Sequence, residues 1–352
     1  MSGTDEVIIE RRGSAGIISL NRPKALNSLT LPMVRAVASA LESFAGDPAI
    51  ASVIAKGEGE RGLCAGGDIR LLHQSGKDGS DAAETFWREE FRLNHAISRY
   101  PKPYVVLMDG ITMGGGVGLS AHGSHRVVTE RTRLAMPETG IGYFPDVGAT
   151  WLLPRAPGEA GTWMGLAGLP VDAADALHAG FADHCVASSA LPALMDAIAA
   201  LPAPALAQDV HALIKTMATN AGKSRLAVNR DTIDRTFAGD TVEDILKALA
   251  KESGEFAAET AGVIASRSPT SLKLTLRLLR AGRASTNLAE CLNRELGACM
   301  GILYNPDFYE GVRAAVIDKD RNPKWSPASL AEVTVDSIDR FFVPAQPSLF
   351  AA

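Results

Sequence analysis

Short apolar runs alternate with helical patterns through the first half of the chain. Val7–Glu10 and Gly16–Leu20 predict two strands of a hairpin, because polar and glycine residues separate them. A helix is expected after Thr30, a suitable N-cap, since apolar residues recur at helical spacing until Asp47-Pro48. Further strands are expected at Ser52–Ala55, Tyr104–Met108, Arg126–Val128 and Leu134–Met136, a loop at 57–67, and a second helix at Ala82–Tyr100.

The pattern changes after Leu201–Pro204, which has the composition of a linker. Three alanine- and leucine-rich amphipathic helices are expected beyond it, at Thr241–Thr260, Ser271–Gly282 and Ser285–Met300. We therefore predict an α/β fold, with a core at residues 1–200 and a helical C-terminal region at 201–352.

Composition excludes several classes of protein. Hydrophobic residues make up 46% of the 352 positions, enough for a substantial core, and the net charge of -5 argues against a nucleic-acid partner. No run reaches the roughly 18 apolar residues of a membrane span. The N-terminus carries two acids and no apolar stretch, unlike a secretory or mitochondrial leader, so a cytoplasmic location is expected.

The cysteine and histidine positions predict neither a metal site nor a disulfide framework. The four cysteines are scattered without a CxxC pair, and the seven histidines show no metal-ligand spacing. A serine triad is not expected either, because GxSxG is absent. Cys64 lies in a glycine loop, but no nearby cation would activate its thiol, so packing is favoured over nucleophilic catalysis.

Two glycine-containing loops follow strands, at Gly62–Arg70 and Met113–Ser120. Backbone N–H groups at the start of a helix have no internal partner, and two aimed at one oxygen form an oxyanion hole. Tight turns are the plainer alternative for these glycines. A third reading is dinucleotide binding, since Gly116–Ala121 fits GxGxxA and Glu138 lies downstream. It is disfavoured because residues 111–113 separate the strand from the glycines.

Two acids, Glu138 and Asp146, lie among apolar, glycine and proline residues in the segment Met136–Gly148. Such surroundings raise a carboxyl pKa and favour work as a general base or nucleophile. Helix capping is the alternative for Asp146. Glu90 lies in a helical pattern, where an exposed, solvated acid is the alternative to a functional one.

Together these segments resemble the crotonase (enoyl-CoA hydratase/isomerase) superfamily. The resemblance rests on Asn21–Asn27, Cys64–Ile69, Gly114–Gly116 and Pro137-Glu138, and it runs from about Val7 to Phe342. It implies a fold of repeated ββα units and an acyl-CoA whose thioester oxygen accepts N–H bonds from Gly67 and Gly115. The resemblance also implies that the adenine and phosphates of coenzyme A lie along Lys24, Cys64, Ala65 and Gly66.

The longer strings, Asp109–Ser120, Met136–Gly148, Ser268–Lys273, Phe308–Ala314, Ile317–Asp320 and Pro323–Trp325, are similar to those of the superfamily's thioester hydrolases. Hydratases of the superfamily carry a second glutamate where this chain has Gly118, and glycine where it has Asp146. The resemblance thus implies hydrolysis of a short branched 3-hydroxyacyl-CoA, 3-hydroxyisobutyryl-CoA, to 3-hydroxyisobutyrate and coenzyme A in valine catabolism. Glu138 would attack or activate water, Asp146 would orient the acyl group or water, and Glu90 would bind the substrate hydroxyl.

The alternatives are a hydratase or isomerase on the same fold and a non-catalytic acyl-CoA-binding protein. No separate cofactor is expected, because coenzyme A belongs to the substrate. Association into a homo-oligomer is possible for this superfamily.

Overall fold

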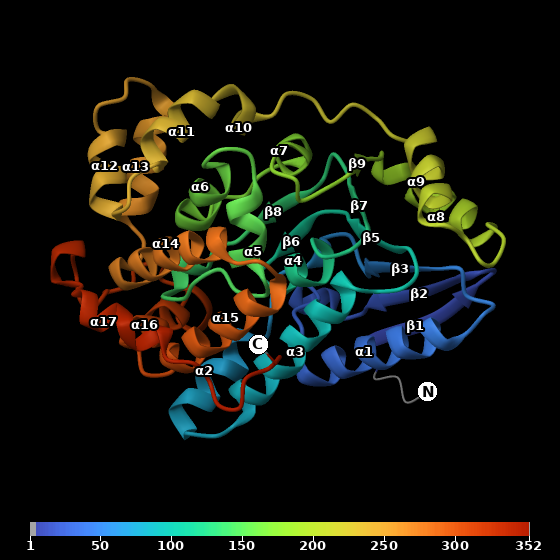
Figure 1. Ribbon diagram of the computed structural model, residues 1–352, viewed down its shortest axis with the longest axis horizontal. Coiled ribbons are helices and arrows are strands. Elements are labelled where there is room, and N and C mark those ends of the chain that lie inside the picture. The colour runs from blue at the N-terminus through green and yellow to red at the C-terminus, as the bar shows by residue number, and fades with distance from the viewer. Residues whose placement is uncertain (1–4, 352) are drawn as a thin grey trace. The chain divides into compact units, whose positions relative to one another are not determined.

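The computed structural model describes residues 5–351, whose elements are labelled in Figure 1. The chain forms two compact units, each assembled from three separate stretches. The first unit contains residues 5–67, 89–134 and 171–224, and the second contains residues 68–88, 135–170 and 225–351. The units interleave along the chain, so neither coincides with residues 1–200 or 201–352. The assignment of acyl-CoA chemistry to residues 1–200 stays a prediction.

A six-stranded sheet forms the centre of the first unit, in the order β1-β2-β3-β5-β7-β9. The predicted hairpin is confirmed as the antiparallel pair of β1 and β2, and every other neighbouring pair is parallel. The strands are β1 Val7–Arg12, β2 Ala15–Leu20, β3 Ser52–Gly57, β5 Tyr104–Met108, β7 His125–Val128 and β9 His184–Cys185.

A second, three-stranded sheet has the order β4-β6-β8, formed by Gly62–Cys64, Ile111–Met113 and Arg133–Ala135. The sequence analysis missed β4 and β6, which are only three residues long. Strands of the two sheets alternate along the chain as β3-β4, β5-β6 and β7-β8, with helices between the pairs. This is the repeated ββα order that the resemblance implies. Because β4 and β6 are parallel neighbours, the loops that follow them leave the same edge.

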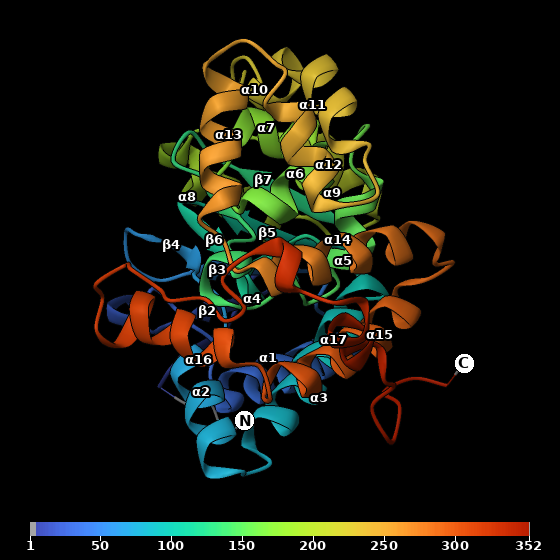
Figure 2. The ribbon, with the colours of Figure 1, turned by 90° about the vertical axis from the view of Figure 1, so that its left-hand side faces the viewer.

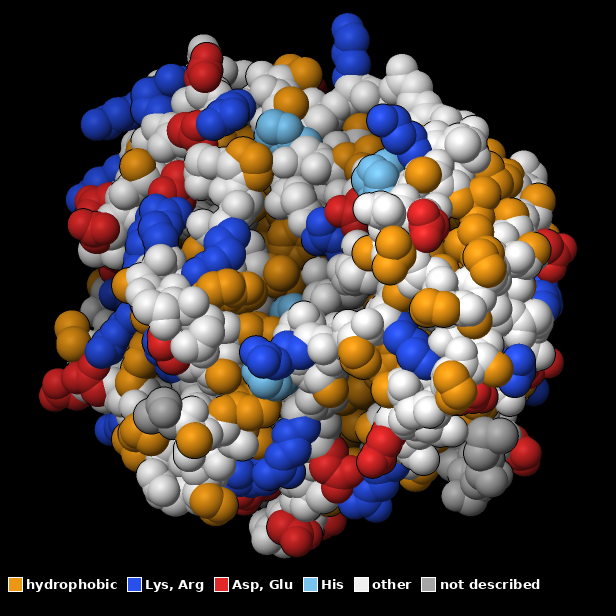
Figure 3. All heavy atoms as spheres, turned by 45° about the vertical axis from the view of Figure 1, so that its right-hand side comes forward, with side chains coloured by type: hydrophobic (Ala, Val, Ile, Leu, Met, Phe, Trp, Pro, Cys, Tyr) orange, Lys and Arg blue, Asp and Glu red, His pale blue; other side chains and the backbone are white. Residues whose placement is uncertain are grey.

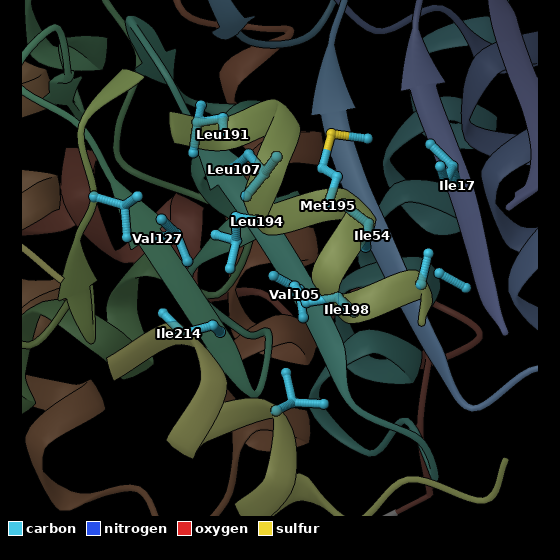
Figure 4. Packing of buried hydrophobic residues seen from close by; sticks show 14 of the residues in the cluster. Ile17, Ile54, Val105, Leu107, Val127, Leu191, Leu194, Met195, Ile198 and Ile214 are labelled. Carbon is cyan, nitrogen blue, oxygen red and sulfur yellow. The ribbon is translucent and has the colours of Figure 1, made fainter. Parts of the chain in front are cut away.

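Apolar side chains from the large sheet pack against helices α8 (Leu191–Ala199) and α9 (Ala207–Thr216). Figure 4 shows Ile54, Val105 and Val127 from three adjacent strands facing Leu194 and Ile198 of α8. Residues on both faces of β3 and β5 are buried, which explains why these strands are continuous apolar runs rather than alternating ones. The core of the first unit therefore lies between the sheet and these two helices.

Two of the remaining helices of the first unit, α1 and α3, are long, and the others are short. Thr30 caps α1 as predicted, accepting a hydrogen bond from Met33 N, and Pro32 lies in the first turn. Helix α3 begins in the second unit and ends in the first. These helices are α1 Leu31–Gly46, α3 Ala82–Ser98, α4 Gly115–Ser120 and α7 Ala173–His178, with the 3-10 turns η1 Pro23–Ala25 and η4 Ser188–Ala190.

The second unit is helical. Helix α14 packs against α5, α6 and α17, while α11, α12 and α13 lie side by side next to α6 (Figure 2). Its α-helices are α2 Ile69–Asp78, α5 Ala149–Leu152, α6 Ala160–Ala167, α10 Arg225–Val228, α11 Arg230–Phe237, α12 Val242–Leu249, α13 Glu255–Ala265, α14 Pro269–Ala284, α15 Leu288–Ile302, α16 Pro306–Val312 and α17 Val335–Asp339. Shorter turns are η2 Glu138–Ile141, η3 Leu153–Arg155, the π-helical η5 Arg313–Ile317, η6 Leu330–Glu332 and η7 Arg340–Phe342.

Two of the three predicted C-terminal helices are confirmed as α14 and α15. The third prediction, one helix over Thr241–Thr260, is wrong, because the chain breaks between α12 and α13. Gly254 lies in this break with φ of 126°, a conformation that L side chains rarely adopt and that cannot continue a helix. The sequence analysis also missed α2, which buries Leu72, His73 and Ser75.

Within residues 5–351, no helix combines the length and apolar character needed to cross a membrane. The same residues contain no group of three or more His, Cys, Asp or Glu side chains arranged to bind a metal ion. On the face shown in Figure 3, acidic side chains lie among the basic ones, so the charge there is mixed in sign.

Candidate active site

The two glycine loops meet within the first unit. A Cβ atom added to Gly66 would lie 3.7 Å from Met113 O and 3.9 Å from Gly115 N. One added to Gly115 would lie 3.3 Å from Gly67 N. The parallel pairing of β4 with β6 thus brings Gly67 and Gly115 together, as the oxyanion-hole hypothesis requires.

Neither the Gly67 nor the Gly115 amide donates a hydrogen bond to another group within residues 5–351. Gly115 is the first residue of α4, where N–H groups have no partner inside the helix. Gly67 pairs with Leu29 in an isolated parallel bridge, in which Leu29 N donates to Gly66 O at 2.8 Å. Two adjacent, unpaired N–H groups can bind one carbonyl oxygen and stabilise its developing negative charge.

Glu90 lies beside these amides on α3, with 2% of its surface exposed. Its Oε1 atom would be 2.6 Å from a Cβ added to Gly115. The alternative of a solvated helical acid is therefore wrong. The close approach also explains the glycine at position 115, because any side chain there would displace Glu90 or the loop.

The Cys64 thiol packs rather than reacts. Cys64 is fully buried, its Sγ accepts from Gly66 N at 3.4 Å, and burial raises the pKa of the thiol to about 12. A thiol with such a pKa is protonated at neutral pH and is a poor nucleophile. Ala65 continues the loop and donates its N–H to Leu26 O, while Gly66 is buried with φ of 110°.

Lys24 lies on η1 and is exposed, with no ion-pair or hydrogen-bond partner within the described part of the chain. The turn that carries it is held by Asn27, a buried residue whose Nδ2 donates to Glu58 O and Gly62 O, each at 3.1 Å. Asn27 Oδ1 accepts from Arg22 N at 2.8 Å. The sequence analysis included Asn27 in a motif but assigned it no role.

Gly118 is a buried residue within α4, donating its N–H to Gly114 O. Gly116 also lies inside this helix rather than in a turn between a strand and a helix. The preceding strand, β6, belongs to the small sheet. The GxGxxA match thus lacks the strand–turn–helix context of a dinucleotide site.

The two candidate acids lie in the second unit. Glu138 opens η2 and is 6% exposed, and its Oε2 is buried without a hydrogen-bond partner among residues 5–351. Burial first, and the charge of Asp146 second, raise the pKa of Glu138 well above its usual range. The structure thus brings the two carboxyls into electrostatic contact across the η2 turn, as their spacing predicts.

Asp146 is 7% exposed and accepts a hydrogen bond from the Tyr143 hydroxyl at 3.0 Å. Burial raises the pKa of Asp146 to about 7, although the bond from Tyr143 lowers it. The Asp146 side chain does not cap α5, whose N-cap is Gly148 without a side-chain bond. The capping alternative is therefore wrong, and Asp146 is available for chemistry.

The structure adds two polar side chains that sequence analysis missed in this unit. The Tyr143 hydroxyl also lies 3.0 Å from Cys299 Sγ, and its ring stacks on Phe144 at 4.8 Å. Glu295 on α15 is fully buried and bonds to Gly148 and Thr150. Tyr143 belongs to the segment Met136–Gly148, but the sequence gives no indication that its hydroxyl binds Asp146. Glu295 lies in an ordinary amphipathic helix, and nothing in that pattern distinguishes it from an exposed acid.

Tyr143→Phe is expected to move the acid limb of the kcat–pH profile to higher pH. The ring packing survives, but Asp146 loses a donor that stabilises its ionised form, so the pKa of its carboxyl rises. Steady-state turnover rates from pH 5 to 9 measure the shift. Tyr309→Phe is the matched control, because that hydroxyl bonds to Leu303 O instead. An acid limb that stays in place would contradict this role.

The first unit carries two unpaired amides of the kind that binds an oxyanion. The second unit carries a pair of desolvated acids of the kind that serves as nucleophile or general base. The chain belongs to the enoyl-CoA hydratase/isomerase family, whose sequence model matches residues 15–342. This confirms the superfamily and the crotonase fold that the resemblance implied.

Among curated proteins, the chain is similar to the mitochondrial 3-hydroxyisobutyryl-CoA hydrolases of several vertebrates. It is 45% identical to that of Rattus norvegicus over 344 residues, which is 96% of this chain and 89% of the relative. It is 43% identical to that of Homo sapiens, over 96% of this chain and 88% of the relative.

Solved structures with the same fold carry different names. A carnitinyl-CoA dehydratase from Mycobacterium thermoresistibile has a TM-score of 0.93 and 44% identity, covering 99% of both chains. An enoyl-CoA hydratase from Rhodobacter sphaeroides has a TM-score of 0.89 and 40% identity, covering 98% of this chain and all of the other. The similar proteins therefore include a hydrolase, a dehydratase and a hydratase. Individual side chains must show which of these reactions the chain is suited to.

Proposed function

We propose that this protein hydrolyses the thioester of a short branched 3-hydroxyacyl-CoA, 3-hydroxyisobutyryl-CoA, to 3-hydroxyisobutyrate and coenzyme A. The observation that carries the proposal is the pairing of Glu138 with a second buried acid, Asp146, while Gly118 supplies no carboxylate on α4. The curated relatives named for this hydrolysis support it over nearly the whole chain. Under this proposal, the protein takes part in valine catabolism.

The proposal assigns roles to the candidate residues in both units. The amides of Gly67 and Gly115 bind the thioester oxygen, and Glu90 binds the hydroxyl of the acyl group. The adenine and phosphates of coenzyme A lie along Lys24, Cys64, Ala65 and Gly66; the exposed ammonium of Lys24 supplies the positive charge that an anion needs.

Glu138 in its ionised form attacks the thioester carbon or takes a proton from the attacking water. In the covalent route, a C–O bond to Glu138 forms as the C–S bond breaks, and the thiolate of coenzyme A leaves and takes up a proton. Water then hydrolyses the acyl anhydride and regenerates the carboxylate. Asp146 orients the acyl group or the water. No separate cofactor enters either route.

The second candidate is hydration or dehydration at the acyl chain, which the names of the two solved relatives favour. Adding water across a double bond needs a proton donor and a base at neighbouring carbons. Superfamily hydratases place one of these acids where this chain has Gly118, so the side chains support hydrolysis.

Release of free thiol distinguishes the candidates. The wild-type protein is expected to release one thiol per 3-hydroxyisobutyryl-CoA and to leave the enoyl absorbance of crotonyl-CoA unchanged. Loss of that absorbance without thiol release would instead support hydration. No reaction with either thioester, together with tight binding of both, would support the non-catalytic alternative.

The cytoplasmic location and possible homo-oligomer stay predictions. The curated relatives are named as mitochondrial proteins.

A further inference from the structure

Glu295 carries a buried carboxyl group that the proposed mechanism does not use. It lies on α15 with none of its surface exposed, yet it accepts three hydrogen bonds from a turn about 145 residues earlier in the chain. Its Oε2 accepts from Gly148 N at 2.7 Å, and its Oε1 accepts from Thr150 N at 3.0 Å and Thr150 Oγ1 at 2.5 Å. A buried carboxyl group left without hydrogen-bond partners would destabilise the fold.

The turn that Glu295 binds is strained. Val147, directly after Asp146, has φ of 53°, and Gly148 has φ of 82°. Glycine tolerates this left-handed region, but a β-branched residue is a genuine outlier there. Such a conformation persists only where surrounding groups enforce it, and it commonly occurs beside functional residues. The backbone of Val147, the residue that follows Asp146, is therefore held in a conformation that it disfavours.

Glu295 also supplies the hydrogen-bond acceptors that the backbone N–H groups of the turn lack. Helix α5 begins at Ala149, spans four residues and has no side-chain cap of its own. The N–H groups of Gly148 and Thr150 would be left without acceptors inside so short an element. Glu295 accepts from both N–H groups and so fixes the backbone on the C-terminal side of Asp146. The carboxyl of Asp146 is itself bound by the Tyr143 hydroxyl.

We propose that Glu295 is a positioning residue for thioester hydrolysis, which clamps the strained Val147-Gly148 turn and thereby fixes the carboxyl of Asp146. This inference rests on the proposed function. The electrostatics agree with an interaction between Glu295 and Asp146. The pKa of Glu295 is raised to about 8, mainly by burial and also by the charge of Asp146, while the bonds from Thr150 and Gly148 lower it.

Glu295→Gln tests the clamp, because an amide cannot accept at both ends: its NH2 group would face an N–H of Gly148 or Thr150. We expect kcat for 3-hydroxyisobutyryl-CoA to fall by between about 10- and 100-fold, since small misplacements of reacting groups cost this much. KM should stay within about twofold, because Glu295 does not contact the substrate under the proposal. A purely structural role would not separate kcat from KM in the folded protein.

Glu290→Gln is the matched control on the same helix. Glu290 accepts from Thr286 near the start of α15 and is exposed, so its loss should leave kcat unchanged. Thr150→Val is a milder second variant that removes only the hydroxyl bond. It should lower kcat in the same direction but less, and it keeps the test decisive if Glu295→Gln does not fold.

The outcomes separate the two proposals. If the wild-type protein releases thiol while folded Glu295→Gln and Thr150→Val both match Glu290→Gln in kcat, the positioning role is overturned and the proposed function stands. If the wild-type protein releases no thiol, the proposed function fails, and the role of Glu295 in hydrolysis fails with it.

Discussion

Glu138→Gln is expected to lower kcat for 3-hydroxyisobutyryl-CoA at least about 100-fold, the usual loss when a general base or nucleophile is removed. Glu138 is buried, its Oε2 has no partner among residues 5–351, and its pKa is raised. A carboxylate freed of hydrogen bonds and solvent is a strong base, and the amide of glutamine replaces its shape but not its basicity. Thiol release under saturating substrate measures the loss.

Glu255→Gln provides the control, since Glu255 is an exposed acid in the first turn of α13. Its kcat should match that of the wild-type protein. Single-turnover hydrolysis in oxygen-18 water adds information on the route, because label found in the Glu138 side chain by peptide mass spectrometry requires an acyl-enzyme. Retention of wild-type kcat in folded Glu138→Gln would remove this residue from the mechanism.

Gly115→Ala is expected to lower kcat by about 100- to 1,000-fold, the range for loss of an oxyanion donor. The added methyl group would lie 3.3 Å from Gly67 N, in the space where the thioester oxygen is proposed to bind, and 2.6 Å from Glu90 Oε1. The φ of Gly115 is not positive, so the alanine backbone itself is not strained. Hydrolysis rates and calorimetric binding of coenzyme A should show lost turnover with coenzyme A affinity retained.

Gly262→Ala is the matched substitution, because a Cβ at that helical position would meet nothing within 4 Å. It should leave kcat unchanged and the fold as stable or slightly more so. Equal kcat for Gly115→Ala and Gly262→Ala would mean that the amide pair does not bind the reacting oxygen.

Much of the fold was predictable because its signals are local. The apolar runs Ser52–Ala55 and Tyr104–Met108 are short and bounded by loop residues, which favours buried strands, and both are confirmed as β3 and β5. Helix α2 was missed because its sequence mixes Gly, Ser, Lys and Asp with only a narrow apolar face. The break before Gly254 was missed because α12 and α13 share one continuing apolar pattern.

The sequence motifs of the candidate site were predictable, but the hydrogen bonds that connect its residues were not. Their apolar surroundings marked Glu138 and Asp146 as candidate acids, whereas the family resemblance, rather than the glycine pattern itself, singled out Gly67 and Gly115. Glu295 could not be named from sequence, because its function depends on a turn about 145 residues away. The sequence does not indicate which buried acid accepts a hydrogen bond from which backbone amide. Such supporting residues can be identified only from the structure.

The carboxyls that the second unit buries make its folding a proton-uptake reaction. In the unfolded chain, Asp146 and Glu295 lose their protons near pH 4, whereas the folded chain holds them until about pH 7 and 8. The stability that they contribute is complete below pH 4 and declines as the pH rises through the folded values. These two groups therefore stabilise the folded state most at a pH below the one at which Asp146 ionises, so ionising Asp146 lowers the free energy of unfolding.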